Sequence, residues 1–206
     1  MPSRAYCRMI NGPAGLAEER TIMSRRHLLR KHLSDAWYTT ITNQYCDRLI
    51  NSERGLQVFF CAALLQQFEQ DKVVRRIFVE PRISMKSAPG VLYPDIVICN
   101  SKQIIGVVEL KYVPRGLPKY AKDLGTLGNI AKADGITLSN DRYCGIERNR
   151  FYTLASDAVL CWAGVYTGSH LNLKDKIGAK VKQQFLQLDA LTVDGKDPTL
   201  YPPGME

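Results

Sequence analysis

The sequence predicts a mixed α/β domain in which a β-sheet is flanked by helices. Apolar residues recur at helical spacing in the first third of the chain, and two β-branched runs surround a short polar break near its middle. Further helical and strand patterns follow. An order of helix, three strands, helix, strand and helix is typical of a mixed sheet with helices packed against it.

The N-terminal part is predicted to be a loose arm followed by a helix. Residues 1–20 contain two prolines and two glycines and show little periodicity. The first half of the helix (25–32) is rich in basic residues, which we interpret as a solvated face, with phosphate contact as the alternative. From Ser24, a candidate N-cap, apolar residues recur every fourth position on one face: Leu29, Leu33, Trp37 and Ile41.

A second helix is predicted from residue 51 or 52 to residue 70. Glu53 lies in its first turn, where a carboxylate suits the positive end of the helix dipole. Residues 73–85 alternate well enough for one strand, in which Pro81 indicates an edge position or a bulge. The helix has a predicted buried stripe of Leu56, Phe60, Leu64 and Phe68.

The middle of the chain is predicted to form a β-hairpin. Its two apolar runs, 95–99 and 104–110, flank the polar break 100–103. After the hairpin we predict a loop at 113–118, a helix at 119–133, a loop at 135–150, a strand at 159–166, a helix at 174–188 and a surface tail at 198–206.

Length and composition fit an ordinary globular domain. The chain has 206 residues, of which 45% are hydrophobic and 23% are charged, unlike a disordered or fibrous chain. We predict one globular unit, in which an N-terminal basic arm and helix (1–50) pack on a core domain (51–206). No Ser-His-Asp arrangement, phosphate-binding glycine loop or dinucleotide-binding glycine pattern is present.

The net charge of +8 is unevenly distributed. Residues 1–50 contain eight Lys and Arg against four acids, and residues 112–150 contain seven against four. A basic excess favours a polyanionic partner, because neutralised phosphates drive nucleic-acid affinity. From charge alone, a solvated basic surface is an equally good interpretation.

The cysteine pattern indicates a reducing compartment. The six cysteines form no CxxC pair and no cluster with histidine, and several lie within apolar runs such as that around Cys61. We interpret them as small buried hydrophobic residues. That apolar run is eight residues long, far short of the ~20 that span a bilayer, and we expect a cytoplasmic protein without membrane partners.

Three charged residues of the hairpin form a candidate site. Glu109 and Lys111 are two positions apart, so on a strand they project from the same face. Asp95 opens the other strand directly after a proline, and antiparallel pairing brings it beside them. Two carboxylates and an ammonium are costly to desolvate together unless a ligand binds there. A hard divalent cation with oxygen ligands is the expected ligand.

These residues resemble the motif of the PD-(D/E)XK nuclease superfamily, which has the restriction-endonuclease-like fold. Pro94-Asp95 is followed, after thirteen residues, by Glu109-Leu110-Lys111. Many members also carry an upstream helix with an early Glu and a Gln four positions on, which here are Glu53 and Gln57. The order of elements between residues 51 and 166 resembles the core of that family.

The resemblance implies a magnesium site, with Mn²⁺ as a substitute. Asp95 and Glu109, with the backbone carbonyl of Leu110, would bind the metal, and Glu53 would complete the acidic pocket. Lys111 would orient the attacking water or offset charge in the transition state. Gln57 shares a helix face with Glu53 and would hydrogen-bond in the site.

Purely structural roles remain open for several of these residues. Glu109 and Lys111 alone could be an ion pair at a sheet edge, which would leave Asp95 after its proline unexplained. Glu53 could serve only the helix dipole. Three basic residues downstream are candidate nucleic-acid contacts, and a solvated surface is the alternative for them: Arg115, Lys119 and Lys122.

The sequence-based hypothesis is a Mg²⁺-dependent nuclease that hydrolyses phosphodiester bonds of nucleic acid, with DNA as the expected substrate. One alternative is a non-catalytic nucleic-acid-binding or assembly module with the same fold. Another is a structure-selective resolvase or an RNA nuclease. A single-site domain that cuts both strands would favour a homodimer.

Overall fold

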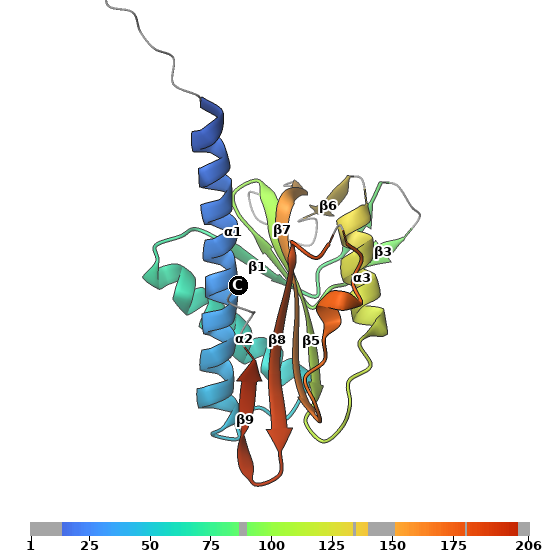
Figure 1. Cartoon of the computed structure of the whole chain (residues 1–206). Coiled ribbons are helices and arrows are strands. Elements are labelled where there is room, and N and C mark those ends of the chain that lie inside the picture. Colours follow the sequence, from blue (N-terminus) through green and yellow to red (C-terminus); the bar gives the residue numbers. More distant parts are fainter. Residues whose placement is uncertain (1–13, 87–89, 134, 140–150, 180, 202–206) are drawn as a thin grey trace, which may run out of the picture.

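The computed structural model describes residues 14–86, 90–133, 135–139, 151–179 and 181–201, with side chains from residue 26 onward (Figure 1). Within these residues the fold is mixed α/β, with one curled sheet flanked by helices. This confirms the predicted class. The strands are β1 Arg76–Val79, β2 Ile83–Met85, β3 Val91–Leu92, β4 Ile96–Cys99, β5 Gln103–Val113, β6 Ile136–Ser139, β7 Phe151–Thr167, β8 Phe185–Val193 and β9 Lys196–Tyr201.

The long strands β5, β7 and β8 run parallel at the centre of the sheet. The strand order is β1-β4-β5-β7-β6-β2-β3, and β8 adds to β7 while β9 adds to β8. The pairing of β5 with β7 shifts register between Ile104 and Gly106, where β7 passes from Leu154 to Val159. The remaining pairs are antiparallel, including the β4–β5 hairpin predicted from the sequence.

Helices cover both faces of the sheet (Figure 1). On one face lie α1 (Ala14–Thr39), its π-helical continuation (Thr40–Tyr45) and α2 (Glu53–Gln70), which share an apolar cluster with alternate residues of β4, β5, β7 and β8. On the other face lie α3 (Ala121–Lys132) and a short 3₁₀ helix (Leu173–Asp175). The intervening strand residues point to this second face, as a period of two requires.

The predicted buried stripes of α1 and α2 are confirmed. The four apolar residues predicted on each helix are all almost completely buried, and Ser52 caps α2 by accepting a hydrogen bond from the Gly55 N–H at 3.1 Å. Helix α1 begins at Ala14 rather than near Ser24, so residues 14–20 are not a loose arm. The run after Pro13 consists mainly of strong helix formers, which explains the earlier start. Residues 1–13 lie outside the described part.

The single strand predicted at 73–85 is wrong. Two strands occupy it, and β1 pairs with β4 whereas β2 pairs with β3 and β6. The chain turns at Glu80, whose φ of 46° lies in the left-handed region, and Pro81 follows directly. The proline marks a break between two strands rather than a bulge within one.

The helix predicted at 174–188 is also wrong. A 3₁₀ turn ends at Asp175 and the chain then forms β8, in which nearly every residue is buried. Gly178 interrupts the helical pattern, and a strand packed on both faces shows a continuous apolar run that periodicity does not separate from a helix. The predicted surface tail forms β9 up to Tyr201. Pro198 is tolerated there because β9 is an edge strand.

Two further boundaries differ from prediction. The loop predicted at 135–150 contains strand β6, while residues 140–150 lie outside the described part. The strand predicted at 159–166 extends over Phe151–Thr167. β6 pairs with the first residues of the extended β7.

Two arginines of α1, Arg26 and Arg30, donate hydrogen bonds to backbone carbonyls of the sheet side. Arg26 Nε donates to the Asp157 carbonyl at 3.1 Å, and Arg30 Nη2 donates to the carbonyls of Gln183 and Phe185 at 2.7 and 3.0 Å. These bonds fasten α1 to the segment around β7 and to the start of β8. Phosphate contact is therefore a poor explanation for this pair.

The four described cysteines are free thiols. The predicted burial is confirmed for Cys99 and Cys161 but is wrong for Cys61 and Cys46, which are partly exposed. Cys7 and Cys144 lie outside the described residues. In the part of the chain that the structure describes, no helix is long and apolar enough to cross a membrane.

A buried carboxylate anchors the segment after β7. Asp189 on β8 is fully buried, and its Oδ2 accepts hydrogen bonds from Gln187 Nε2 at 2.8 Å and pairs with His170 Nε2 at 2.9 Å. Gln187 Oε1 also accepts the Leu173 N–H at 3.0 Å, and the His170 ring packs on Tyr201 with centroids 4.6 Å apart. Burial raises the pKa of Asp189 to about 6, although Gln187 and His170 oppose this.

This geometry predicts a pH-dependent loss of stability. The folded pKa of Asp189 lies above its ordinary value, so the folded state binds the proton more tightly and wild-type stability falls as pH rises from about 4 to about 6. Asp189→Asn removes this titrating group. Between pH 4 and pH 7 the variant should therefore lose less unfolding free energy than wild type, by on the order of 1 kcal/mol. Urea unfolding at both pH values measures it.

Asp194→Asn, at an exposed position after β8, is the control and should retain the wild-type dependence. An Asp189→Asn protein with an unaltered pH dependence would contradict the assignment.

Candidate active site

The β4–β5 hairpin brings the three predicted residues to one place. Ile96 pairs with Val108, so Asp95 lies across from the Glu109–Leu110 step of β5. Val97 of β4 and Val107 of β5 belong to the apolar cluster on the side of the sheet that α3 covers. By strand alternation, Asp95, Glu109 and Lys111 point to the same side of the sheet.

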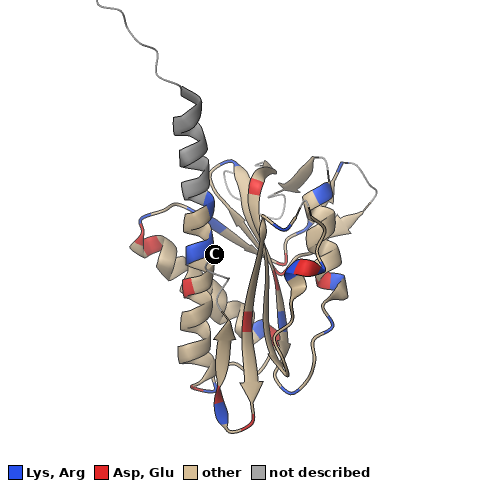
Figure 2. Ribbon diagram, viewed as in Figure 1, with Lys and Arg blue, Asp and Glu red and all other residues tan. Residues whose placement is uncertain are grey.

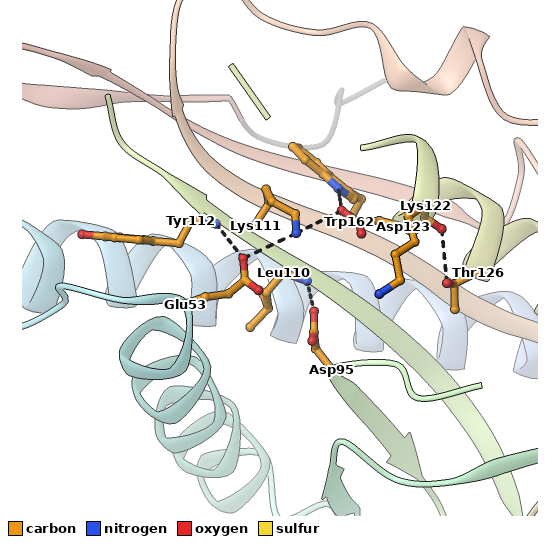
Figure 3. A network of polar contacts seen from close by, with 9 residues as sticks. All are labelled: Glu53, Asp95, Leu110, Lys111, Tyr112, Lys122, Asp123, Thr126 and Trp162. Carbon is orange, nitrogen blue, oxygen red and sulfur yellow. Dashed lines mark hydrogen bonds and ion pairs between the residues drawn. The ribbon is translucent and has the colours of Figure 1, made fainter. Parts of the chain in front are cut away.

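The backbone around Asp95 is held from three directions. The Leu110 N–H donates to Asp95 Oδ2 at 2.6 Å (Figure 3). The carbonyl oxygen of Asp95 accepts hydrogen bonds from Gln57 Nε2 at 3.0 Å and from the Glu80 N–H at 2.9 Å. Gln57 therefore reaches the site by positioning the Asp95 backbone, a role that the sequence did not specify.

Glu53, the first residue of α2, reaches the end of β5. Its Oε2 accepts the Tyr112 N–H at 3.1 Å and lies 3.5 Å from Lys111 Nζ (Figure 3). The Tyr112 hydroxyl donates to the Ile50 carbonyl at 2.9 Å, which ties the segment before α2 to the same strand. The structure thus joins Glu53 to the site through Lys111.

Asp123 is a site residue that the sequence analysis missed. It lies in the first turn of α3, is 6% exposed, and its Oδ2 is 3.6 Å from Lys111 Nζ. Trp162 Nε1 of β7 donates to the same oxygen at 3.3 Å (Figure 3). A sequence signal existed, because Asp123 occupies a position on the buried stripe that continues at Leu127 and Ile130.

The site concentrates negative charge away from water. Glu109 is 7% exposed, and its pKa is raised to about 9 by burial first and then by Asp95 and Asp123. Burial is also the main cause of the raised pKa values of Asp95 and Asp123. Burial lowers the pKa of Lys111, but Asp123, Glu53 and Asp95 outweigh it, and the pKa lies above its ordinary value.

The three candidate nucleic-acid contacts are all exposed. Arg115 and Lys119 lie on the segment that joins β5 to α3, and Lys122 lies in the first turn of α3 directly before Asp123. Thr126 Oγ1 donates to the Lys122 carbonyl at 3.2 Å, one helical turn earlier on α3 (Figure 3). They follow the strand that carries Glu109 and Lys111 and lie before Asp123 in the chain.

The acids supply the donor type that Mg²⁺ prefers without forming a closed cage. Among the side chains that the structure describes, no group of three His, Cys, Asp or Glu residues could hold a metal ion. Mg²⁺ commonly uses one or two carboxylates with waters and substrate phosphates, so Asp95 and Glu109 with the Leu110 carbonyl are a chemically suitable set. In this arrangement Glu53 contacts Lys111 and the Tyr112 amide instead.

Comparison of the chain with protein-family models, with curated proteins and with solved structures finds no significant match.

The raised pKa of Glu109 generates a stability prediction. Because the folded pKa of about 9 exceeds the ordinary 4.5, the wild-type protein loses stability as pH rises between these values. The Glu109→Gln side chain resembles the protonated acid. In EDTA at pH 7, the free energy of unfolding of this variant should therefore lie within about 1 kcal/mol of the wild-type value. At pH 8.5 the variant should gain stability relative to wild type, as measured by urea unfolding.

Glu69→Gln, at an exposed position of α2, is the matched control and should show no such gain. A loss of several kcal/mol in Glu109→Gln at both pH values would show that Glu109 is a structural residue.

Proposed function

We propose that this protein is a Mg²⁺-dependent nuclease of the PD-(D/E)XK type, with a restriction-endonuclease-like fold and DNA as substrate. The supporting observation is the convergence of Asp95, Glu109 and Lys111 on one side of the β4–β5 hairpin, in a cluster with more carboxylates than cations. Such an arrangement is unfavourable for stability and suits a site that binds a cation and a phosphate.

Each residue has a distinct role in this proposal. Asp95 and Glu109, with the Leu110 carbonyl, hold the metal, which when bound polarises a phosphoryl oxygen and makes hydroxide available near neutral pH. Gln57 fixes the Asp95 backbone by its hydrogen bond to the carbonyl. The Leu110 N–H orients the Asp95 carboxylate from the other strand.

Lys111 supplies positive charge and orients the attacking water. Its ammonium lies between Glu53 and Asp123, at 3.5 and 3.6 Å, so two carboxylates fix its position from two helices. Asp123 is itself held by Trp162 Nε1. Glu53 and Asp123 are thus positioning residues for Lys111, since both carboxylates contact its ammonium.

A non-catalytic nucleic-acid-binding module is the second candidate. The observation that favours it is the set of exposed cations Arg115, Lys119 and Lys122, which can contact phosphates without a metal ion. The buried acid pair opposes it, because binding phosphates does not require desolvated carboxylates near them.

Metal binding separates the two candidates. Isothermal calorimetry with Mg²⁺ should give heat of binding in wild type and none in Asp95→Asn or Glu109→Gln, because each variant removes one of two carboxylates. Cleavage of supercoiled plasmid, linear duplex, single strands or RNA should be lost in parallel and should stop on addition of EDTA. Unchanged Mg²⁺ affinity in both variants would overturn the site assignment.

Lys111 tests whether the site turns over substrate. Lys111→Ala should keep most Mg²⁺ and nucleic-acid affinity but lower the cleavage rate by on the order of 10²-fold or more. Lys111→Arg should restore little, because the guanidinium is larger and does not give up its proton. Lys102→Ala, exposed at the opposite end of the same hairpin, is the control and should cleave normally.

Wild-type cleavage by Lys111→Ala would exclude the proposed role. A wild-type protein that binds DNA but cleaves none of the four substrates would establish the binding module.

A further inference from the structure

The segment between β5 and α3 (residues 114–120) has a fixed backbone. Thr192 Oγ1 donates to the Pro114 carbonyl at 2.6 Å, the Thr167 N–H donates to the Gly116 carbonyl at 3.2 Å, and the Gly116 N–H donates to the Val113 carbonyl at 3.0 Å. Prolines at 114 and 118 also restrict φ at both ends. The conformation of this loop is therefore set by β7 and β8.

This fixed loop presents a leucine to solvent. Leu117 is 70% exposed, and among the large apolar side chains of the described residues only Val74 is more exposed. A Cβ added at Gly168, whose φ is 107°, would lie 3.1 Å from Leu117 Cδ2, so a glycine makes room for the leucine. A single exposed leucine is ordinary on a protein surface. Here, however, the hydrogen bonds to β7 and β8 fix the backbone so that the Leu117 side chain stays in solvent.

Cations flank the leucine on both sides. Arg115 and Lys119 are exposed two positions before and after it, and Lys122 follows on the first turn of α3. Figure 2 shows basic positions along this loop. An apolar group between cations suits nucleic acid, in which bases lie between phosphates, better than it suits an apolar protein surface.

The loop borders the candidate active site. It connects the strand that carries Glu109 and Lys111 to the helix that carries Asp123. A strand whose phosphates lie on Arg115 and Lys119 would thus pass beside the acids.

We propose that Leu117 is a wedge that inserts between bases of the bound nucleic acid, and that the preferred substrate has a weakened base step, such as a single-nucleotide gap, near the point of cleavage. This inference depends on the proposed function for its nucleic-acid partner. Insertion requires unstacking, which costs least where a base step is already interrupted. The wedge therefore selects by structure rather than by base sequence.

The test uses the full chain in EDTA, so that no cleavage occurs. Fluorescein-labelled duplexes, intact or with a one-nucleotide gap, measure affinity by anisotropy, and 2-aminopurine beside the gap reports unstacking. Wild type should bind the gapped duplex more tightly and raise the 2-aminopurine fluorescence. Leu117→Ala should bind the gapped duplex about 10-fold more weakly and should no longer raise the 2-aminopurine fluorescence. Its affinity for the intact duplex should stay the same.

Leu65→Ala, which removes a comparably exposed leucine from α2, should behave as wild type. If Leu117→Ala retains both the gap preference and the fluorescence rise, the wedge is wrong while the nuclease proposal stands. If wild type binds no nucleic acid, both are wrong. If Leu117→Ala instead dissociates a wild-type dimer on size-exclusion chromatography, the leucine belongs to an interface between copies and the wedge is overturned.

Discussion

The placement of two desolvated carboxyl groups side by side is the constraint on which this structure depends. Asp95 lies directly before β4 and Glu109 lies on β5, and burial is the main cause that raises both pKa values. The charges of Asp95 and Asp123 add to the rise at Glu109, and those of Glu53 and Asp123 add to the rise at Asp95. Nothing in the packing of a sheet requires this pair, and apolar residues at both positions would avoid the desolvation cost. The Leu110 N–H offsets part of that cost at Asp95, and the Lys111 charge opposes the rise of both pKa values only as a smaller effect, because its ammonium pairs with Glu53 and Asp123.

The parallel register of β5 and β7 supplies the outer support of the site. Glu109 lies beside Trp162, and Lys111 lies beside Gly164. A Cβ at Gly164 would come within 2.3 Å of the Trp162 ring. The indole therefore lies over Gly164 and fits there only because glycine has no side chain. The indole in that position reaches Asp123 across the face of the sheet. A backbone feature of β7 thereby fixes an acid on α3.

Sequence reasoning succeeded where the pattern was local. The stripes of α1 and α2 and the β4–β5 hairpin follow from spacing alone, and the hairpin was enough to bring Asp95, Glu109 and Lys111 together. It failed for β8, because a strand buried on both faces has no alternation to separate it from a helix. Asp123 was missed for a related reason. Its contact with Lys111 joins two elements whose packing angle no single stretch of sequence encodes.

The ion pairs of Lys111 bear on the choice between enzyme and binding module. Within the described residues its ammonium pairs with Glu53 and Asp123, the two acids contributed by helices, rather than with the strand acids Asp95 and Glu109. The negative charges of Asp95 and Glu109 are consequently the least neutralised in the site. Positive charge added there is expected to stabilise the fold more than positive charge added at Glu53 or Asp123. Protonation of Glu109 is one way to supply that charge, as its raised pKa indicates. A divalent cation is the other, and it competes with the proton for the same oxygens, since metal binding requires the carboxylate form. A module that only binds phosphates does not need carboxylates that bind a cation, and on this ground we propose a catalytic site.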